Sequence, residues 1–182
     1  MKKIVLTFGL IAGAILAVMM FVTLPMVDKV SFDRLEILGY STMVAAFLMV
    51  FFGIRTYREN IGGGTISFGK AFQVGILIML VACACYVIAW EIIYFKIAPD
   101  FADKYGNYMI EKARAAGASP EALAAQREQF KGFKAMYDNP LTNAAITLLE
   151  PLPVGLPITL ISAAILRRKE RKQNSPKSVA TA

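Results

Sequence analysis

Two glutamates, Glu91 and Glu150, lie within strongly apolar stretches of a 182-residue chain that contains no histidine. An ionisable group in an apolar span is costly, so it usually faces the protein interior and is a default candidate for function. If the two carboxyl groups met, burial and mutual repulsion would raise at least one pKa, which would suit a proton-carrying pair. In the alternative interpretation, which we prefer for Glu91, this side chain reaches toward water beside Trp90 and pairs with Lys96.

The stretch around Glu150, LLEPLPVGLP, places prolines at Pro151, Pro153 and Pro157. Each proline removes one i→i−4 hydrogen bond of a helix, and the residue before it disfavours helical geometry. The pattern therefore predicts a break in the helix near 150–155. Irregular backbone survives in hydrocarbon only where neighbouring helices cover it or where it lines a watery cavity. We therefore expect Glu150 to point inward, as at the broken helices of transporters.

A competing interpretation makes residues 141–150 an interfacial helix, with the chain entering the membrane at Pro151. The remaining 16 residues to Leu166 would then cover only about 24 Å, which is short of a hydrocarbon core of about 30 Å. This shortfall favours a single broken span over the interfacial helix.

The sequence offers no arrangement for catalysis or metal binding. Cys83 and Cys85 are two positions apart in an apolar segment, so on a helix they point to different sides, and zinc would need further ligands. No nucleophile is paired with a base. We therefore expect a protein that is not an enzyme, with no catalytic residue, no metal and no cofactor.

Apolar segments dominate the chain, which is 57% hydrophobic and 18% charged with a mean hydropathy of +0.53. This composition exceeds the apolar share of a soluble domain. Four segments approach or exceed the roughly 20 residues needed to cross a bilayer, and the first is too long for a cleaved signal peptide. The predicted fold is an all-α integral membrane protein in which residues 1–166 form one domain. The predicted spans cover about 4–27, 37–54, 71–95 and 141–166.

Lys and Arg residues cluster at the N-terminus, in the 55–70 loop and in the tail 167–182, whereas 28–36 and 97–140 are nearly balanced in charge. Because positive loops stay inside, both termini are predicted to be cytoplasmic, and the tail to be basic and disordered. The net charge of +7 therefore sits at span ends and forms no single basic face. The predicted partner is the lipid bilayer, with no nucleic acid.

Residues 97–140 read as two amphipathic helices, which predicts an extracytoplasmic helical hairpin between spans three and four. Gly117 can end the first helix, and Ser119 with Pro120 can begin the second. The preferred interpretation is that its aromatic stripes pack on each other and on the ends of the spans. The first stripe comprises Phe101, Tyr105, Tyr108 and Met109.

Gly9 and Gly13 form a ridge of small residues that permits close approach of another helix. That neighbour could equally be a helix of the same chain, a second copy in a homo-oligomer or another membrane protein.

The stretches GIRTYRENIGGGTISFGKAFQVG and AWEIIYFKIAPDF resemble a family of small bacterial inner-membrane proteins that is catalogued as a domain of unknown function. The resemblance covers nearly the whole chain. It implies a multi-pass protein of the bacterial inner (plasma) membrane with four spans, an inner loop like 53–75 and a helical segment before the last span. It supplies no catalytic residue.

Two functional hypotheses follow. The first is a non-enzymatic membrane module that acts through helix or partner contacts. The alternative is a small transporter or proton-coupled permease component that uses Glu91 and Glu150.

Overall fold

A computed structural model describes residues 1–168, so the predicted basic tail lies outside the described residues from position 169 onward. The described chain is all-α, as predicted, and contains no strand, only an isolated bridge between Ile66 and Arg168. Its first half consists of α1 (Lys2–Thr23), the short 3₁₀ turn η1 (Leu24–Met26), α2 (Phe32–Asn60) and α3 (Phe68–Ile92). The π-helical turn η2 (Ile93–Ile97), α4 (Phe101–Ala115), α5 (Pro120–Tyr137), α6 (Pro140–Leu149) and α7 (Leu152–Leu166) follow.

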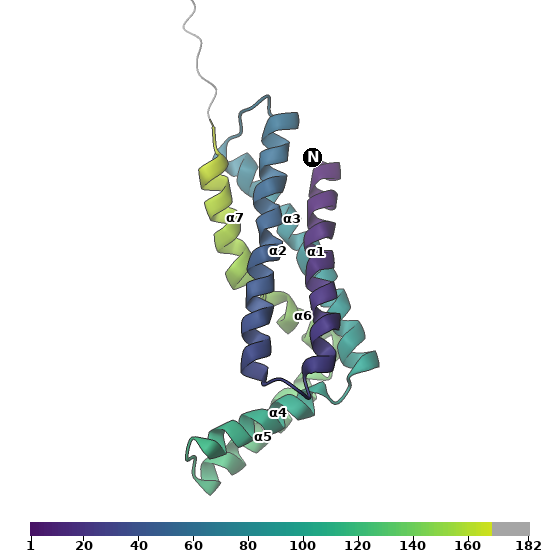
Figure 1. The fold of residues 1–182 in the computed structure, drawn as a ribbon, viewed down its shortest axis with the longest axis vertical. Helices are drawn as coiled ribbons and strands as arrows, with labels where there is room; N and C mark the ends of the chain where they lie inside the picture. Colours follow the sequence, from purple (N-terminus) through teal and green to yellow (C-terminus); the bar gives the residue numbers. More distant parts are fainter. Residues whose placement is uncertain (169–182) are drawn as a thin grey trace, which may run out of the picture.

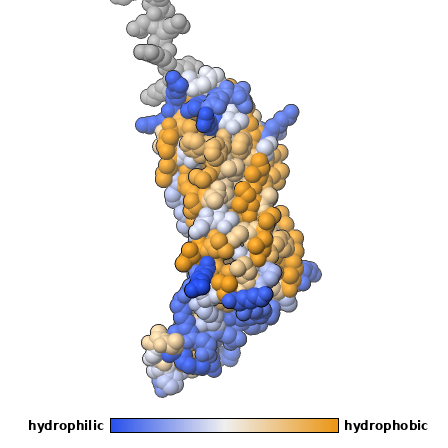
Figure 2. Space-filling model, viewed as in Figure 1, coloured by the Kyte–Doolittle hydropathy of each residue, from blue (hydrophilic) through white to orange (hydrophobic). Residues whose placement is uncertain are grey.

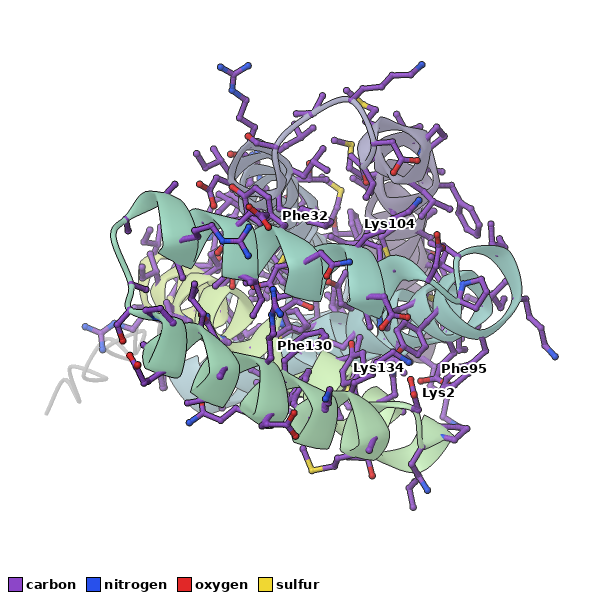
Figure 3. The ribbon with its side chains drawn as sticks, turned by 90° about the horizontal axis from the view of Figure 1, so that it is seen from below. Lys2, Phe32, Phe95, Lys104, Phe130 and Lys134 are labelled. Carbon is purple, nitrogen blue, oxygen red and sulfur yellow. The ribbon has the colours of Figure 1, made fainter. Side chains whose placement is uncertain are left out.

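The helices α1, α2, α3 and α7 run along one another as an elongated bundle (Figure 1). One end of the bundle, here called the N-terminal end, contains the start of α1, the α2–α3 loop and the end of α7. The opposite end, here called the capped end, is covered by α4 and α5, which lie side by side across it (Figure 3). Among the described residues, α4 and α5 therefore cover only the capped end of the bundle.

Three helical segments are long and apolar enough to cross a membrane: Lys2–Met26, Phe32–Asn60 and Phe68–Ile97. The pair α6 and α7 meets the same criteria if its two parts, bent by 40°, are one crossing. On the face shown in Figure 2, a hydrophobic band lies between two hydrophilic ends. The chain thus has three to four candidate spans, as expected for a multi-pass membrane protein.

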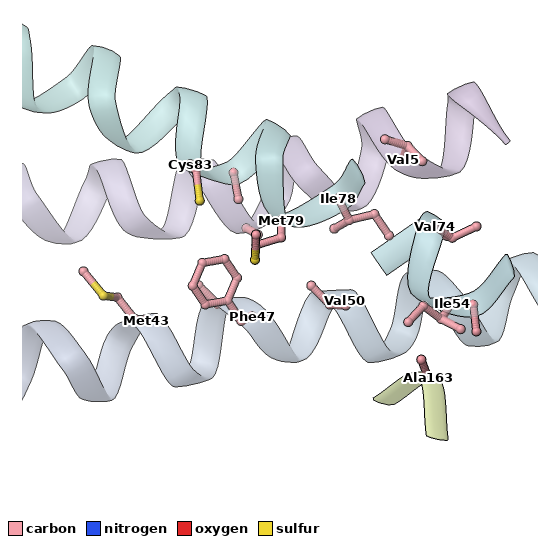
Figure 4. Packing of buried hydrophobic residues seen from close by; sticks show 14 of the residues in the cluster. Val5, Met43, Phe47, Val50, Ile54, Val74, Ile78, Met79, Cys83 and Ala163 are labelled. Carbon is pink, nitrogen blue, oxygen red and sulfur yellow. The ribbon is translucent and has the colours of Figure 1, made fainter. Parts of the chain in front are cut away.

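Most of the core lies in the N-terminal half of the bundle, where α1, α2, α3 and α7 meet (Figure 4). Its last members, Leu16, Met43 and Tyr86, reach the capped half. Phe47 and Ile54 of α2 and Ile78 of α3 are each 0% exposed. These positions repeat at helical spacing, so one face of each helix is fully covered. Apolar packing of this kind fixes the distances between the helices.

Gly9 and Gly13 bring α1 close to α3. A β-carbon at Gly9 would lie 2.6 Å from Cβ of Val81, and one at Gly13 would lie 2.5 Å from Cβ of Cys85. Real β-carbons do not approach so closely, so only glycine permits this contact. The predicted small-residue ridge is therefore occupied by a helix of the same chain.

Backbone hydrogen bonds join two distant parts of the chain at the N-terminal end. Ile66 and Arg168 exchange two of them, at 3.0 and 2.9 Å, and Arg58 Nη1 donates to the carbonyl of Leu166 at 3.4 Å. The preceding turn uses Gly63 and Gly64 at φ of 58° and 84°, a region that favours glycine. The end of α7 is thus attached to the α2–α3 loop.

Candidate functional site

A cavity of about 460 Å³ lies at the capped end, between the bundle and the α4–α5 pair. Residues from α1, α2 and α3 form its sides, while Phe101, Tyr105, Phe130 and Phe133 of α4 and α5 close its end. Its size falls in the range of small-molecule sites.

The cavity exists because the fourth helical segment changes direction. Helix α7 packs against α2 and α3, whereas α6 packs against α3 and α5. The 40° bend between them falls at Glu150 and Pro151, within the predicted interval. Pro151 caps α7 at its first turn, where the missing N–H costs no helical bond. The break therefore leads α6 away along α3 and leaves space beside α2.

Glu150 presents its carboxylate to this space. Oε2 accepts a hydrogen bond of 2.8 Å from the hydroxyl of Tyr86 on α3. The residue is exposed because it lines the cavity wall. None of the ion pairs formed by residues 1–168 includes Glu150. Among the described residues, its carboxyl group is therefore bound by one tyrosine hydroxyl and otherwise faces the cavity.

Helix α2 contributes a second carboxylate. Glu36, Gly39, Tyr40 and Met43 line the cavity and recur at i, i+3, i+4 and i+7, which is one face of a helix. Glu36 is exposed, and among the described residues it likewise takes part in no ion pair. Two acidic side chains thus share the wall with tyrosines.

Aromatic rings hold the α4–α5 pair against the bundle. The ring of Phe32, at the start of α2, lies 5.7 Å from that of Phe101, 5.3 Å from that of Tyr105 and 5.1 Å from that of Tyr108. Phe101 also meets Trp90 of α3 edge to face at 4.9 Å. Such pairs add to the apolar burial. Viewed from the capped end, Phe32 lies beside α4, and Phe130 of α5 lies between α5 and α4, where its ring faces Gly106 (Figure 3).

A buried polar network fixes α6 to α3. The indole N–H of Trp90 donates to the hydroxyl of Tyr137 at 2.8 Å. Asn143, which is 0% exposed, donates from Nδ2 to the carbonyl of Tyr137 at 3.2 Å and accepts from the hydroxyl of Thr147 at 3.2 Å. Buried polar groups satisfied in this way specify a single arrangement of the helices.

Asp138 extends the contact outside the spans. Its Oδ1 accepts from the hydroxyl of Tyr94 at 2.6 Å, and its Oδ2 accepts from Lys134 Nζ at 2.9 Å. The Tyr94 hydroxyl, followed by the lysine, holds the pKa of Asp138 below its ordinary value because both favour the charged carboxylate. The junction between α5 and α6 is therefore attached to η2.

The two glutamates singled out from the sequence do not share the cavity wall. Glu91 lies about 140° around α3 from Tyr86, at 3.6 residues per turn, and it is not part of the cavity wall. The pairing of Glu91 with Lys96 is wrong within the described residues: no ion pair joins them, and Glu91 Oε1 is buried without a hydrogen-bond partner. Only Glu150 belongs to the candidate site.

The prolines have separate places in α6 and α7. Pro151 is fully buried at the break, whereas Pro153 and Pro157 are exposed on α7. Pro157 lies inside that helix, where it leaves the carbonyl of Pro153 without its helical partner. The break thus depends on the first proline, and α7 accommodates the others.

Sequence reasoning missed Tyr86, Tyr40 and Glu36 as parts of the site. The helical spacing of Glu36, Tyr40 and Met43 was a usable signal, but span two was predicted to begin at 37, which left Glu36 in a loop. Nothing in the sequence pairs Tyr86 with a glutamate 64 positions later.

Comparison with protein-family models gives a match over residues 7–168 to the family described as "Protein of unknown function (DUF4199)". The chain belongs to this family. The match covers every residue that lines the cavity, so the whole cavity lies within the part of the chain that the DUF4199 model describes. No curated protein and no solved structure matches the chain.

Proposed function

We propose that this DUF4199 protein is a non-enzymatic membrane module that holds a small amphipathic molecule in the cavity at its capped end. The observation that carries this proposal is the position of Glu150: a carboxylate at a helix break, bound by Tyr86, in a cavity of about 460 Å³ with mostly apolar walls. Small-molecule sites commonly combine apolar walls with a few polar groups that orient the ligand.

The proposal includes a bacterial inner-membrane location, four spans and cytoplasmic termini. Helix α7, with 15 residues, rises about 22 Å, and α6, with 10, adds about 15 Å. Together the two helices are long enough to cross a hydrocarbon core of about 30 Å, whereas α7 alone is too short. Basic residues near the N-terminal end support a cytoplasmic position for it, and the α4–α5 pair would then be the extracytoplasmic hairpin.

This topology is tested with a reporter fused after Ala182, which we expect to be active only in the cytoplasm. Alkaline carbonate should leave the protein in the membrane. A reporter active outside the cytoplasm, or extraction by carbonate, would contradict the arrangement.

The cavity offers a direct test of binding. Gly39 lines the wall, and a β-carbon built there meets nothing within 4 Å, so Gly39→Phe should fill the space while the helix stays intact. Gly69→Phe is the matched control, because Gly69 also has open space around it but lies at the N-terminal end. Native mass spectrometry of protein taken from its own membranes should show a bound small molecule in the wild type and in Gly69→Phe. Its absence from both, or its retention in Gly39→Phe, argues against the cavity.

The break at Glu150 also favours a second candidate, a small transporter or proton-coupled permease component. Broken helices place ionisable groups at the midplane sites of transporters. Flux driven by a pH gradient in proteoliposomes should then fall in Glu150→Gln and persist in Glu91→Gln, since Glu91 lies off the cavity wall. Equal flux in wild type and Glu150→Gln, or none in either, rejects transport.

Partner contacts remain part of the proposal at other faces. Since Gly9 and Gly13 are covered by α3, we propose that any homo-oligomer or membrane-protein complex uses the lipid-facing side chains of other helices.

A further inference from the structure

We infer that the molecule held in the cavity is a lipophilic organic cation, such as an ammonium or phosphonium ion carrying apolar groups. This inference rests on the proposed binding function and adds the charge of the ligand. Its first support is the composition of the wall, which contains two acidic residues, Glu36 and Glu150, and no lysine or arginine.

Three lysines of α4 and α5 are paired with other acids. Lys104 Nζ lies 2.9 Å from Asp28, Lys112 Nζ lies 2.7 Å from Asp33, and Lys134 Nζ lies 2.9 Å from Asp138. No ion pair within residues 1–168 reaches Glu36 or Glu150. No basic side chain in this part of the chain is therefore paired with Glu36 or Glu150, and an anion would meet repulsion from their carboxylates.

The free acceptor on Glu150 points to the same class of ligand. Tyr86 donates to Oε2, and no donor from residues 1–168 is within hydrogen-bonding distance of Oε1. A carboxylate oxygen accepts hydrogen bonds and attracts positive charge but cannot donate when ionised. Its environment is largely apolar, where an opposite charge interacts more strongly than in water.

Aromatic side chains supply the remaining recognition. Nine of the wall residues are Phe, Tyr or Trp, drawn from α2, α3, α4 and α5. Aromatic faces attract cations through their quadrupoles and are the usual cage for quaternary ammonium groups. A ring-rich wall also accepts the apolar substituents of such an ion. The acidic wall, the free Oε1 of Glu150 and the aromatic rings thus all favour a lipophilic cation.

The chain contains one tryptophan, Trp90, and it lies on the cavity wall. Its emission therefore reports binding directly. The probes are tetraphenylphosphonium, its isosteric anion tetraphenylborate and the neutral triphenylmethanol, added to full-length protein in nanodiscs. We expect a saturable change in Trp90 emission with the cation and none, or far weaker binding, with the other two.

Glu150→Gln should weaken binding of the cation by at least about tenfold, which corresponds to the loss of one charge-assisted contact. Glu36→Gln gives a second, independent test with a smaller loss. Glu91→Gln is the matched control, since this glutamate lies on α3 but off the wall, and it should bind as the wild type does. Thermal unfolding checks that each variant is folded.

The outcomes separate the two proposals. Equal binding of cation, anion and neutral probe, or unchanged binding in both Glu150→Gln and Glu36→Gln, overturns the inference about charge and leaves the binding cavity standing. Preference for the anion also overturns it. Absence of saturable binding for all three probes rejects the inference. The binding function is then decided separately by native mass spectrometry, which asks whether Gly39→Phe loses the bound small molecule.

Discussion

In the N-terminal half of the bundle, Phe47 of α2 and Met79 of α3 are 0% and 1% exposed and belong to the close-packed core. Two turns closer to the capped end on the same two helices, Tyr40 and Tyr86 line the cavity, with Tyr86 at the edge of the core. The difference lies in the fourth segment. At Gly155 of α7 a β-carbon would lie 2.6 Å from Sδ of Met79, so α7 fills the space beside α2 and α3 in this half. In the capped half the fourth segment continues as α6, which lies away from α2 and leaves that space empty.

This comparison shows that small residues and a proline have complementary effects on one bundle. Gly155 lets α7 lie close to α3 in the N-terminal half. Pro151 marks the position along the bundle where α7 begins and this close contact ends. An acid can persist beside the break because the space there is open to polar contact. The candidate site is therefore a consequence of where close packing stops.

The largest expected effect is a difference in stability between alanine substitutions at a glycine of the packed half, Gly75, and a glycine of the cavity wall, Gly39. A β-carbon at Gly75 would lie 2.7 Å from Cγ2 of Thr159 and 3.0 Å from Cδ1 of Ile54, whereas Gly39 has nothing within 4 Å. Gly75→Ala should destabilise the protein by about 1–3 kcal/mol through overpacking. Gly39→Ala should be neutral or stabilising because alanine favours helix. Thermal unfolding in detergent measures both, and equal effects would mean that the two halves are packed alike.

The capped half depends on polar contacts, and Asn143 is the most buried of them. Asn143→Ala leaves the carbonyl of Tyr137 and the hydroxyl of Thr147 without this partner. The expected cost is about 1–3 kcal/mol for unsatisfied buried groups. Asn107→Ala, at an exposed position of α4, is the control and should lie within about 0.5 kcal/mol of the wild type. Matching melting temperatures for the two variants would refute the role of the network.

The break itself is tested by two prolines in one segment. Pro151→Ala removes two buried methylene groups, which costs about 1.5 kcal/mol at about 0.8 kcal/mol each. Pro157→Ala restores a donor to the carbonyl of Pro153 in α7, so it should be neutral or stabilising. Both are measured by thermal unfolding. Stabilisation by Pro151→Ala would show that the break is not a favoured part of the fold.

The smallest effect concerns acid stability at the junction of α5 and α6. Because the pKa of Asp138 in the folded protein lies below the ordinary value of 3.8, its stabilising contribution is complete above that value. The contribution is lost as the pH falls through the folded pKa, since the unfolded chain binds the proton first. Asp138→Asn should therefore flatten the decline of melting temperature in acid. An unchanged slope would assign the decline to other groups.

The apolar segments and the break were readable from the sequence, and the cavity was not. Long uncharged runs predict helices because hydrocarbon requires every backbone group to be paired within the chain. Pro151 likewise fixes the break through geometry local to Glu150 and Pro151. The apolar segments and the helix break both depend on residues that are close together in the chain, so a single sequence is enough to predict them.

Contacts between distant segments could not be obtained in the same way. The bond between Tyr86 and Glu150, and the separate orientation of Glu91, depend on how α3 is rotated against α6. The start of a helix is also difficult to predict from one sequence. Span two was predicted to begin at 37, whereas α2 begins at Phe32, and this error placed Glu36 outside the helix. The ridge at Gly9 and Gly13 was recognised, but its neighbour on α3 was not identifiable from one sequence.

Cysteine accessibility in membranes tests the central claim most directly, in a background where Cys83 and Cys85 are replaced by alanine. Ile146 lies on the cavity wall and Val50 is buried in the close-packed half. Ile146→Cys should react with a cationic methanethiosulfonate, and more slowly with its anionic counterpart because of Glu36 and Glu150, whereas Val50→Cys should react with neither. Equal protection of both cysteines, or equal reaction, would contradict the division of the bundle into a packed half and an open, acidic one.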